Sequence, residues 1–586
     1  MEQLKGSHEE EHPDKRLGAT LATAICGNDI LSSTFYASSI SIIFAGVYAP
    51  LVLLLIAAVL FLYRKVYIEV VEALPNNGGA YNCLLNGTAK HFAVVAGVIT
   101  ILSYIATAVL SAKTGIAYLD SILAVPVIPL TVLLLGIFAV LVLKGIHDSA
   151  KVALAIFAIH IITLTVFLLL GALHYMHGGS SFAVNATRTA EIAGSDGGIL
   201  AMIFFGFSVS LLGVSGFESS ANFVEEQRKG VFRKTLKNML IVVAIFNPLV
   251  CMVALNTMPY DAIVASKDFL LADAAGVLGG PLFSNWMVID ALLVLAGAVL
   301  TAYIGVSGLA HRMATDECLP SFFTRKNRRG AYPAIIISFF LLCSSILLVT
   351  GGSLLSMAAV YTISFLGVMS LFAFGNLLLR RTRRYLKRTY TAPTYVVVLA
   401  LFATLAGMVG NVVANPKNLF YFSVYFFPFL GLMLCMVYRR RLLTFLLPRT
   451  LNMPSLNEFF ERAFKRTTEQ GLVVFVRDAR WVRQTFDYIE KNESARNITF
   501  VYCSDEEAHL DHTYMAIKKA IERLKLTWLD KGFRISIAHM KRPFGPDAID
   551  AAARELRVPR NRIFMGCIDA HHCFDYSEIS GVRIIH

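Results

Sequence analysis

Apolar stretches dominate residues 17–442 of this chain, and about a dozen of them approach or exceed the length needed to cross a bilayer. A transmembrane helix needs ~20 apolar residues to cross ~30 Å of hydrocarbon. With 56% hydrophobic residues, 16% charged residues and a mean hydropathy of +0.62, the composition excludes an ordinary soluble protein. We therefore predict an α-helical polytopic membrane protein with 12 transmembrane helices. The predicted spans are residues 17–46, 48–73, 91–124, 126–144, 151–175, 195–222, 235–256, 282–311, 332–350, 353–380, 394–413 and 418–442.

The formal net charge of +13 is concentrated in alternate short loops between these stretches. Basic loops of this kind stay on the cytoplasmic side of a membrane, so the pattern predicts that both termini are cytoplasmic. We expect the plasma membrane as the location. The same distribution argues against nucleic acid as a partner. The lipid bilayer and a small solute or monovalent cation are the predicted partners.

The first stretch carries an acid, Asp29, among apolar residues. A carboxylate at that depth is costly unless a partner binds it, so an intramembrane acid indicates a functional site. Gly27 would let the helix break beside Asp29, and the hydroxyl groups of Ser32, Ser33 and Tyr36 follow within two turns. The pattern predicts a site for an ion or solute on an unwound helix.

The sixth stretch is also interrupted by glycine, at Gly213 and Gly216, and it carries a second acid, Glu218. Interrupted spans five apart along the chain indicate an inverted five-plus-five repeat with a binding site near the bilayer midplane. Glu218 has two interpretations: a neutral, hydrogen-bonded structural role, or a role in proton coupling.

The composition changes after Arg449, which divides the chain into a cytosolic tail (1–16), a transmembrane transporter domain (17–449) and a cytosolic α/β domain (450–586). In the last part, short apolar runs alternate with amphipathic segments, which predicts a parallel sheet with helices. We expect a regulatory or dimerising role, with two copies forming a homodimer. The expected strands are Leu472–Val476, Ile498–Tyr502, Phe533–His539, Arg562–Gly566 and Val582–Ile585, and the expected helices are 480–491, 506–529 and 546–557.

Four segments resemble signatures of the amino acid–polyamine–organocation (APC) transporter superfamily, in the right order. Residues 69–81 resemble its E…P…GGxY signature, and residues 204–229 its FFxFxGFE…EE pattern. Residues 311–320 resemble RxxAxDGxLP, with Glu317 where glycine is usual, and residues 386–393 resemble YKRxYRAP. The resemblance implies a secondary transporter with a LeuT-like 5+5 inverted repeat. The sequence contains no P-loop and no G-x-S-x-G motif, so we predict neither an enzyme nor a cofactor.

Within the superfamily, the site residues resemble those of the bacterial potassium-uptake permeases of the KUP and Kim types. In those families an Asp and a Tyr spaced like Asp29 and Tyr36 face the ion. The C-terminal domain is similar in outline to the cytosolic domain of the Kim type. The further residues that the resemblance assigns to potassium are Tyr104, Thr107 and Ser111 on the third span, Ser215 on the sixth and Tyr361 on the tenth.

The chain departs from these families at Ser103, where they carry a second acid on the third span. The missing charge leaves room for a zwitterionic amino acid or for another cation. The predicted function is proton-coupled uptake of potassium or another monovalent cation, with coupling through Asp29 or Glu218. An amino acid permease is the first alternative, and a membrane sensor that signals through its α/β domain is the second.

Other polar residues receive weaker interpretations. Lys113, in the third span, is expected to reach outward or to pair with Asp120. Asp290, in the eighth span, is assigned no role. The segment from Cys567 to Cys573 contains Cys and His residues without the spacing of a tetrahedral site, so no metal site is predicted.

Overall fold

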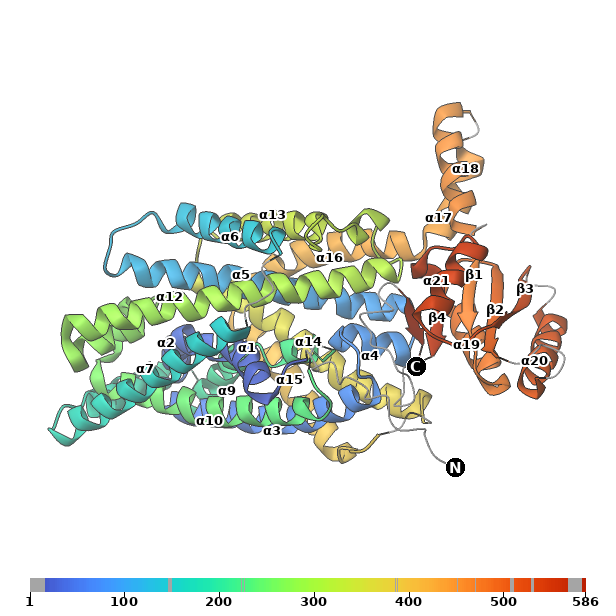
Figure 1. Cartoon of the computed structure of the whole chain (residues 1–586). Coiled ribbons are helices and arrows are strands. Elements are labelled where there is room, and N and C mark those ends of the chain that lie inside the picture. The colour runs from blue at the N-terminus through green and yellow to red at the C-terminus, as the bar shows by residue number, and fades with distance from the viewer. Residues whose placement is uncertain are drawn as a thin grey trace, which may run out of the picture.

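The computed structural model describes residues 16–585, apart from residues 146–149, 196, 223, 226, 385, 387, 451, 469–470, 506–510, 529–531 and 567–581. A long helical bundle carries a smaller α/β part at one of its ends (Figure 1). The Cys567–Cys573 segment lies outside the described residues.

The bundle is built from helices that run mostly along its length (Figure 1). They are α1 (Ala19–Ser32), α2 (Thr34–Ala45), α3 (Ala49–Ala73), α4 (Gly79–Gly87), α5 (Lys90–Asp120), α6 (Val127–Leu143), α7 (Ala150–Met176), α8 (Phe182–Ser195), α9 (Ile199–Ser210), α10 (Val231–Thr257), α11 (Tyr260–Ala265), α12 (Leu270–Thr315), α13 (Pro333–Val349), α14 (Leu354–Thr382), α15 (Thr394–Ala414) and α16 (Lys417–Val437).

Nine segments of the described residues are long and apolar enough to cross a membrane, so the chain is an integral membrane protein. The first two predicted spans fall in a single segment, Ala19–Ala73. Helices α6 and α13 are apolar but only 17 residues long. The count of twelve spans and the inverted repeat stay predictions.

Burial separates the inner helices of the bundle from the outer ones. The most apolar windows of α5 and α14 are 89% and 83% buried, whereas that of α16 is 6% buried. The outer helices expose large apolar side chains, among them Leu169, Phe402 and Phe420. Lipid tails are as apolar as these side chains, so this surface suits contact with a bilayer.

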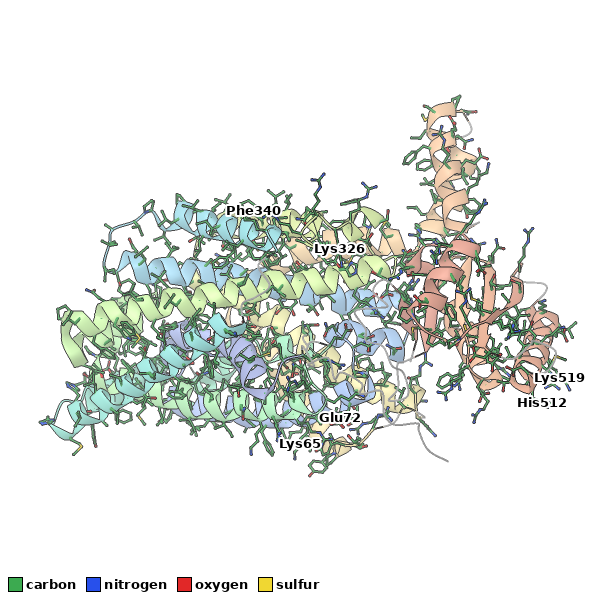
Figure 2. The ribbon with its side chains drawn as sticks, viewed as in Figure 1. Lys65, Glu72, Lys326, Phe340, His512 and Lys519 are labelled. Carbon is green, nitrogen blue, oxygen red and sulfur yellow. The ribbon has the colours of Figure 1, made fainter. Side chains whose placement is uncertain are left out.

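Charged side chains mark the end of the bundle that carries the α/β part. Figure 2 shows Lys65, Glu72 and Lys326 in the half of the bundle nearer that part, and His512 and Lys519 at the far tip of the α/β part itself. Because charges are excluded from hydrocarbon, this end of the bundle faces water.

The α/β part is a five-stranded parallel sheet, as the sequence predicts, and its strands lie in the order β3-β2-β1-β4-β5. The amphipathic helices α19 (Ala479–Asn492) and α20 (His512–Trp528) cover one face, and α21 (Pro546–Glu555) covers the other. Its strands are β1 (Leu472–Phe475), β2 (Asn497–Ser504), β3 (Arg534–Lys541), β4 (Ile563–Gly566) and β5 (Arg583–Ile585). Two further helices, α17 (Arg439–Leu446) and α18 (Pro454–Thr468), lie between the bundle and the sheet in sequence, and α18 projects away from both (Figure 1).

A buried ionic network fastens the α/β part to the bundle. Arg583 of β5 is 1% exposed and donates to Glu493 at 3.0 and 2.5 Å and to Asp316 at 3.1 Å. Lys90, at the start of α5, pairs with Glu493 at 2.8 Å. Burial alone would raise the pKa of Glu493, but the charges of Arg583 and Lys90 outweigh it and lower that pKa to about 2.

Glu317 extends this network from a left-handed backbone conformation, with φ at +61°. This conformation explains why glycine is usual at this position of the superfamily signature. The carboxylate of Glu317 pairs with Arg439, at the start of α17, and with Arg562 at 3.0 Å, next to β4. The departure from glycine therefore supplies a contact to the α/β part.

Candidate functional site

Two interrupted helices meet inside the bundle. Helices α1 and α2 are separated at Ser33. Helix α9 ends at Ser210 and continues as a 3₁₀ turn, Leu211–Val214, followed by extended backbone at Ser215. The carbonyl of Gly213 accepts hydrogen bonds from the Ser33 hydroxyl at 2.8 Å and from Asn247 at 2.9 Å. Unwound backbone is tolerated at this depth because such partners satisfy it.

The break of the first span does not occur at Gly27, as the sequence suggested. Helix α1 runs through Gly27 and Asp29 and ends at Ser32. A Cβ atom at Gly27 would lie 2.6 Å from the ring of Phe157 on α7. Gly27 therefore permits close helix packing, while the interruption at Ser33 is stabilised from the sixth span.

Gly216 lies against both of the predicted acids of the interrupted spans, Asp29 and Glu218. Its φ is +95°, and a Cβ atom there would lie 2.9 Å from Cγ of Asp29. Its backbone N–H donates to Oε2 of Glu218 at 3.0 Å. Asp29 and Glu218 are 3% and 5% exposed. Both carboxyl groups thus lie against Gly216.

Hydroxyl groups surround the acids. Ser103 of α5 donates to Oε1 of Glu218 at 3.4 Å, and the Ser219 side chain lies near Asp29. Two like charges in a buried space repel each other, so a cation or a proton between these acids relieves the repulsion. The arrangement is chemically suited to bind a small cation.

Two predicted tyrosines converge on the predicted serine of the sixth span. Ser215 lies near the hydroxyl groups of Tyr36 on α2 and Tyr361 on α14, and the Tyr361 hydroxyl is buried without a hydrogen-bond partner among the described residues. All three side chains are buried. The structure therefore places Ser215, Tyr36 and Tyr361 in one polar cluster beside Asp29.

The predicted face of α5 is only partly joined to the acids. Tyr104 accepts a hydrogen bond from Asn222 at 2.6 Å, four residues after Glu218. Thr107 donates to the carbonyl of Ser103 in its own helix at 2.9 Å. The Ser111 hydroxyl is buried without a hydrogen-bond partner among the described residues. Among the described contacts, Ser103 and Tyr104 reach the acid segment, and Thr107 and Ser111 do not.

Several residues near the acids were not singled out from the sequence. Tyr67 of α3 stacks on Phe372 with ring centroids 4.1 Å apart, and it lies close enough to Glu218 for an electrostatic interaction. Its hydroxyl is buried and has no hydrogen-bond partner among the described residues. The sequence feature that could have identified Tyr67 is a tyrosine inside an apolar span. Ser219 and Asn222 carried no comparable signal.

Lys113 is paired differently from either expectation. Its ammonium forms an ion pair with Asp268, just before α12, and Asp120 instead accepts a hydrogen bond from the backbone of Val125. Sequence distance favoured Asp120, seven residues away, whereas the fold brings Asp268 to α5.

Residues of the superfamily signatures form ion pairs and hydrogen bonds between helices at the charged end of the bundle. Glu69 of α3 pairs with Arg380 of α14 and accepts from the backbone of Ala392 at 2.9 Å. Tyr81 of α4 donates to Asp316 at 2.9 Å. These residues join the ends of α3, α4, α12 and α14, so they support the bundle rather than the acid site.

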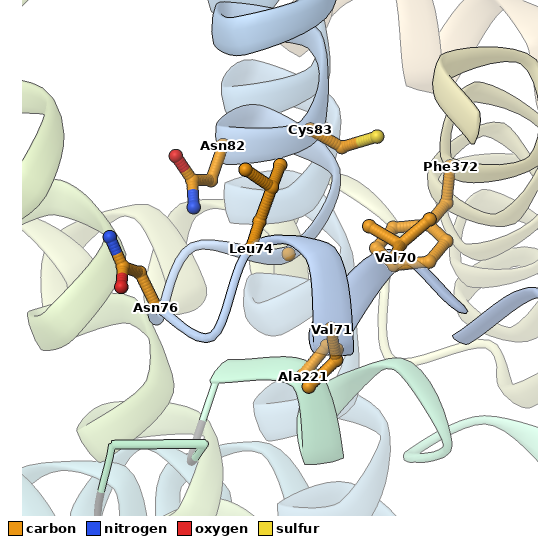
Figure 3. A pocket seen from close by; sticks show the side chains of 9 residues that line it. Val70, Val71, Leu74, Asn76, Asn82, Cys83, Ala221 and Phe372 are labelled. Atoms are coloured by element: carbon orange, nitrogen blue, oxygen red, sulfur yellow. The ribbon is translucent and has the colours of Figure 1, made fainter. Parts of the chain in front are cut away.

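A small pocket with room for about one water molecule lies between α3, α4, α14 and the 3₁₀ turn Glu218–Asn222. Figure 3 shows its lining, which includes Val70, Leu74, Asn82 and Phe372 together with Ala221. None of its lining residues is an acid, so it is distinct from the Asp29–Glu218 site.

An apolar helical bundle with buried acids at two interrupted helices has the properties of a membrane transport protein. The amino acid permease family model matches residues 17–438, and the chain belongs to this family of APC transporters. The predicted superfamily is thereby confirmed, and it is a family of transporters rather than of enzymes.

Two relatives bear on the function. The potassium transporter KimA of Bacillus subtilis (strain 168) is 26% identical over 351 residues, which are 56% of each chain. The uncharacterized protein MJ0609 of Methanocaldococcus jannaschii is 25% identical over 242 residues, 40% of this chain and 53% of that protein. The matches thus span about half the length of both relatives.

Proposed function

We propose that this permease is a secondary active transporter that imports potassium, or another monovalent cation, and that a proton gradient drives this uptake. The observation that carries the proposal is the contact of both Asp29 and Glu218 with Gly216 at the interrupted sixth span. The similarity to KimA supports potassium as the cation.

The oxygen atoms around these acids suit a weakly hydrated cation. Potassium sites combine several neutral oxygens with little charge, so that the ion loses its water and can still leave. Asp29 provides the charge, and Tyr36 and Ser215 provide hydroxyl oxygens. Ser103, Tyr104, Thr107, Ser111 and Tyr361 complete the proposed set of cation-binding residues.

Coupling follows from the two acids. When the cation leaves, a proton on Asp29 or Glu218 would neutralise the charge that the cation had balanced. In a LeuT-like 5+5 arrangement of twelve spans, rocking of one repeat against the other would then expose the site to either side in turn.

An amino acid permease is the second candidate, favoured by the family model and by the absence of an acid at position 103. Such permeases hold the substrate carboxylate on backbone N–H groups of interrupted helices. Here the N–H of Gly216 already donates to Glu218, and Asp29 would repel a substrate carboxylate. This geometry favours the cation.

Residues 17–449 form the transport domain in this proposal, and residues 450–586 form a cytosolic regulatory or dimerising domain of a homodimer in the plasma membrane, with both termini cytoplasmic. A membrane sensor whose α/β domain signals is the remaining alternative. It gains support if no substrate moves while loss of residues 450–586 still changes cell physiology.

The test is tracer uptake into proteoliposomes, with rubidium standing in for potassium and labelled neutral amino acids in parallel. We expect rubidium uptake by the wild type, and loss of uptake in Asp29→Asn without loss of folding, because the cation loses its charged partner. Asp261→Asn, the same substitution at an exposed acid, should transport normally. Normal uptake by Asp29→Asn would remove Asp29 from the site, and amino acid flux without rubidium flux would favour the second candidate.

A further inference from the structure

A second pair of ionisable residues is buried inside the bundle, away from the Asp29–Glu218 contacts. Nδ1 of His160, on α7, lies 2.7 Å from Oδ2 of Asp290, on α12, and both side chains are 0% exposed. Both helices belong to segments that can cross a membrane. Ionisable residues at such depth are costly to keep, and they mark ion or proton pathways in membrane proteins.

Each side chain of this pair has one polar atom in the contact and one that makes no hydrogen bond to a described residue. Nε2 of His160 and Oδ1 of Asp290 are buried and have no hydrogen-bond partner among the described residues. A buried polar pair that serves only to join two helices is stabilised best when every donor and acceptor is satisfied. Two open positions instead leave places where a proton can arrive and depart.

The geometry points to a proton-binding site formed by His160 and Asp290, which takes up and releases one proton in each transport cycle. This inference rests on the proposed proton-coupled transport. With one proton shared, as imidazolium and carboxylate, the pair has no net charge and suits the dry, packed interface. Without it, neutral imidazole and carboxylate leave a net charge of −1, which burial disfavours. Release of the proton therefore favours a conformation in which water reaches between α7 and α12.

Helix α7 carries this change to the cation site through contacts along one face. The ring of His160 packs on Phe35 with centroids 5.2 Å apart, and Phe35 directly precedes Tyr36 of the site. One turn away, Phe157 fills the space at Gly27. At the next turn, the carbonyl of Ala153 accepts a hydrogen bond from Asn28, beside Asp29, at 2.8 Å. A shift of α7 thus acts directly on the residues that flank Asp29.

Other titratable groups lie on the elements packed around the pair. The ion pairs and hydrogen bonds of the described residues connect none of them to His160 or Asp290. These groups include Cys26 and Asp29 on α1, Tyr36 on α2, Tyr104, Lys113 and Tyr118 on α5, His174 on α7, Cys251 on α10, and Asp273 and Tyr303 on α12.

The experiment separates proton-driven uptake from exchange in proteoliposomes, with rubidium as the tracer. His160→Gln and Asp290→Asn should retain rubidium exchange at equal pH on both sides of the membrane. Their uptake driven by an inward proton gradient should be about tenfold lower than that of the wild type. Thr163→Val removes a hydroxyl that accepts from Trp286 of α12 at 2.9 Å, one turn away, and should keep gradient-driven uptake. Gradient-driven uptake at wild-type level in both site variants would overturn the proposal.

A double variant covers the case in which a single variant fails to fold. Replacing a buried ion pair by apolar residues is often neutral for stability, so His160→Leu with Asp290→Leu should fold. If the pair only joins two helices, this protein transports with the wild-type pH dependence, and the proposal fails. We expect exchange that no longer responds to the proton gradient.

A measurement without substrate distinguishes failure of this inference from failure of the proposed function. If the wild type moves no rubidium, the proposed function fails, and the pair is tested by the pH dependence of Tm of the purified protein in detergent. A step in the wild-type curve that the double leucine variant lacks supports proton binding by the pair. Superimposable curves overturn it.

Discussion

Arg583→Met should loosen the junction between the α/β part and the bundle while leaving each part folded. Methionine keeps much of the length and apolar surface of the side chain, including its contact with the ring of Phe564, but removes the charge that holds Glu493 and Asp316. Among the described residues, Lys90 is then the remaining ion-pair partner of Glu493. Removing one member of a buried ion pair costs about 3–5 kcal/mol, because the remaining charge stays desolvated.

The pKa of Glu493 gives a second estimate of how much its ion pairs stabilise the folded protein. It lies at about 2, against an ordinary value of 4.5. A shift of this size corresponds to about 3 kcal/mol, since each unit is about 1.4 kcal/mol. Because the pKa in the folded protein is lowered, this stabilisation is fully present above about pH 4.5 and is lost as the pH falls toward 2.

Hydrogen exchange measured by mass spectrometry is the assay. We expect faster exchange in β5, at the end of α19 and at the start of α5, together with a lower Tm, in Arg583→Met. Arg480→Met is the control, because Arg480 pairs with Asp478 but its side chain is 87% exposed, and such pairs contribute at most about 1 kcal/mol. The reasoning is refuted if both variants behave alike, or if a cycle with Glu493→Gln shows no coupling between Arg583 and Glu493.

Three further predictions concern the site and the domains. Ser103→Asp should raise rubidium affinity about tenfold, because it adds a carboxylate beside Glu218, and an amino acid permease would instead lose amino acid flux. Gly216→Ala should abolish transport and cost about 1–3 kcal/mol, since it combines positive φ with a clash against Asp29. Its control, Gly230→Ala, has positive φ in open space, so equal Tm losses in the two variants would contradict the clash. Truncation after Leu447 should give a monomer that still binds rubidium, as checked by light scattering and tracer binding, and a truncated dimer would show that the bundle forms the interface.

The α/β part shows how much local pattern can predict. The expected strands Leu472–Val476 and Ile498–Tyr502 correspond to β1 and β2 within two residues, and the expected helix 480–491 corresponds to α19 within one. Buried parallel strands are short continuous apolar runs, and surface helices repeat their apolar residues every 3.6 positions. Both signals lie within a few neighbouring residues.

Helix interruptions were predicted only in part. In the sixth span, Gly213 and Gly216 marked the unwound segment. Of the two, Gly216 has a positive φ, a conformation that favours glycine and can be anticipated from its presence. In the first span, the sequence predicts a break at Gly27, but this residue lies within α1 against Phe157. The sequence alone does not distinguish a glycine that permits close helix packing from one that ends a helix. The position of the neighbouring helix distinguishes them.

The sequence by itself determined that this protein is a membrane protein of the APC superfamily, with acids in its first and sixth spans and a separate α/β part. The tertiary structure decided which charges are paired: Lys113 with Asp268, His160 with Asp290, and Arg583 with Glu493. These partners are 90 to 155 residues apart in the chain. Hydropathy and helix periodicity report on local neighbours, whereas ion pairing depends on distances of a few ångströms that exist only once the helices have packed.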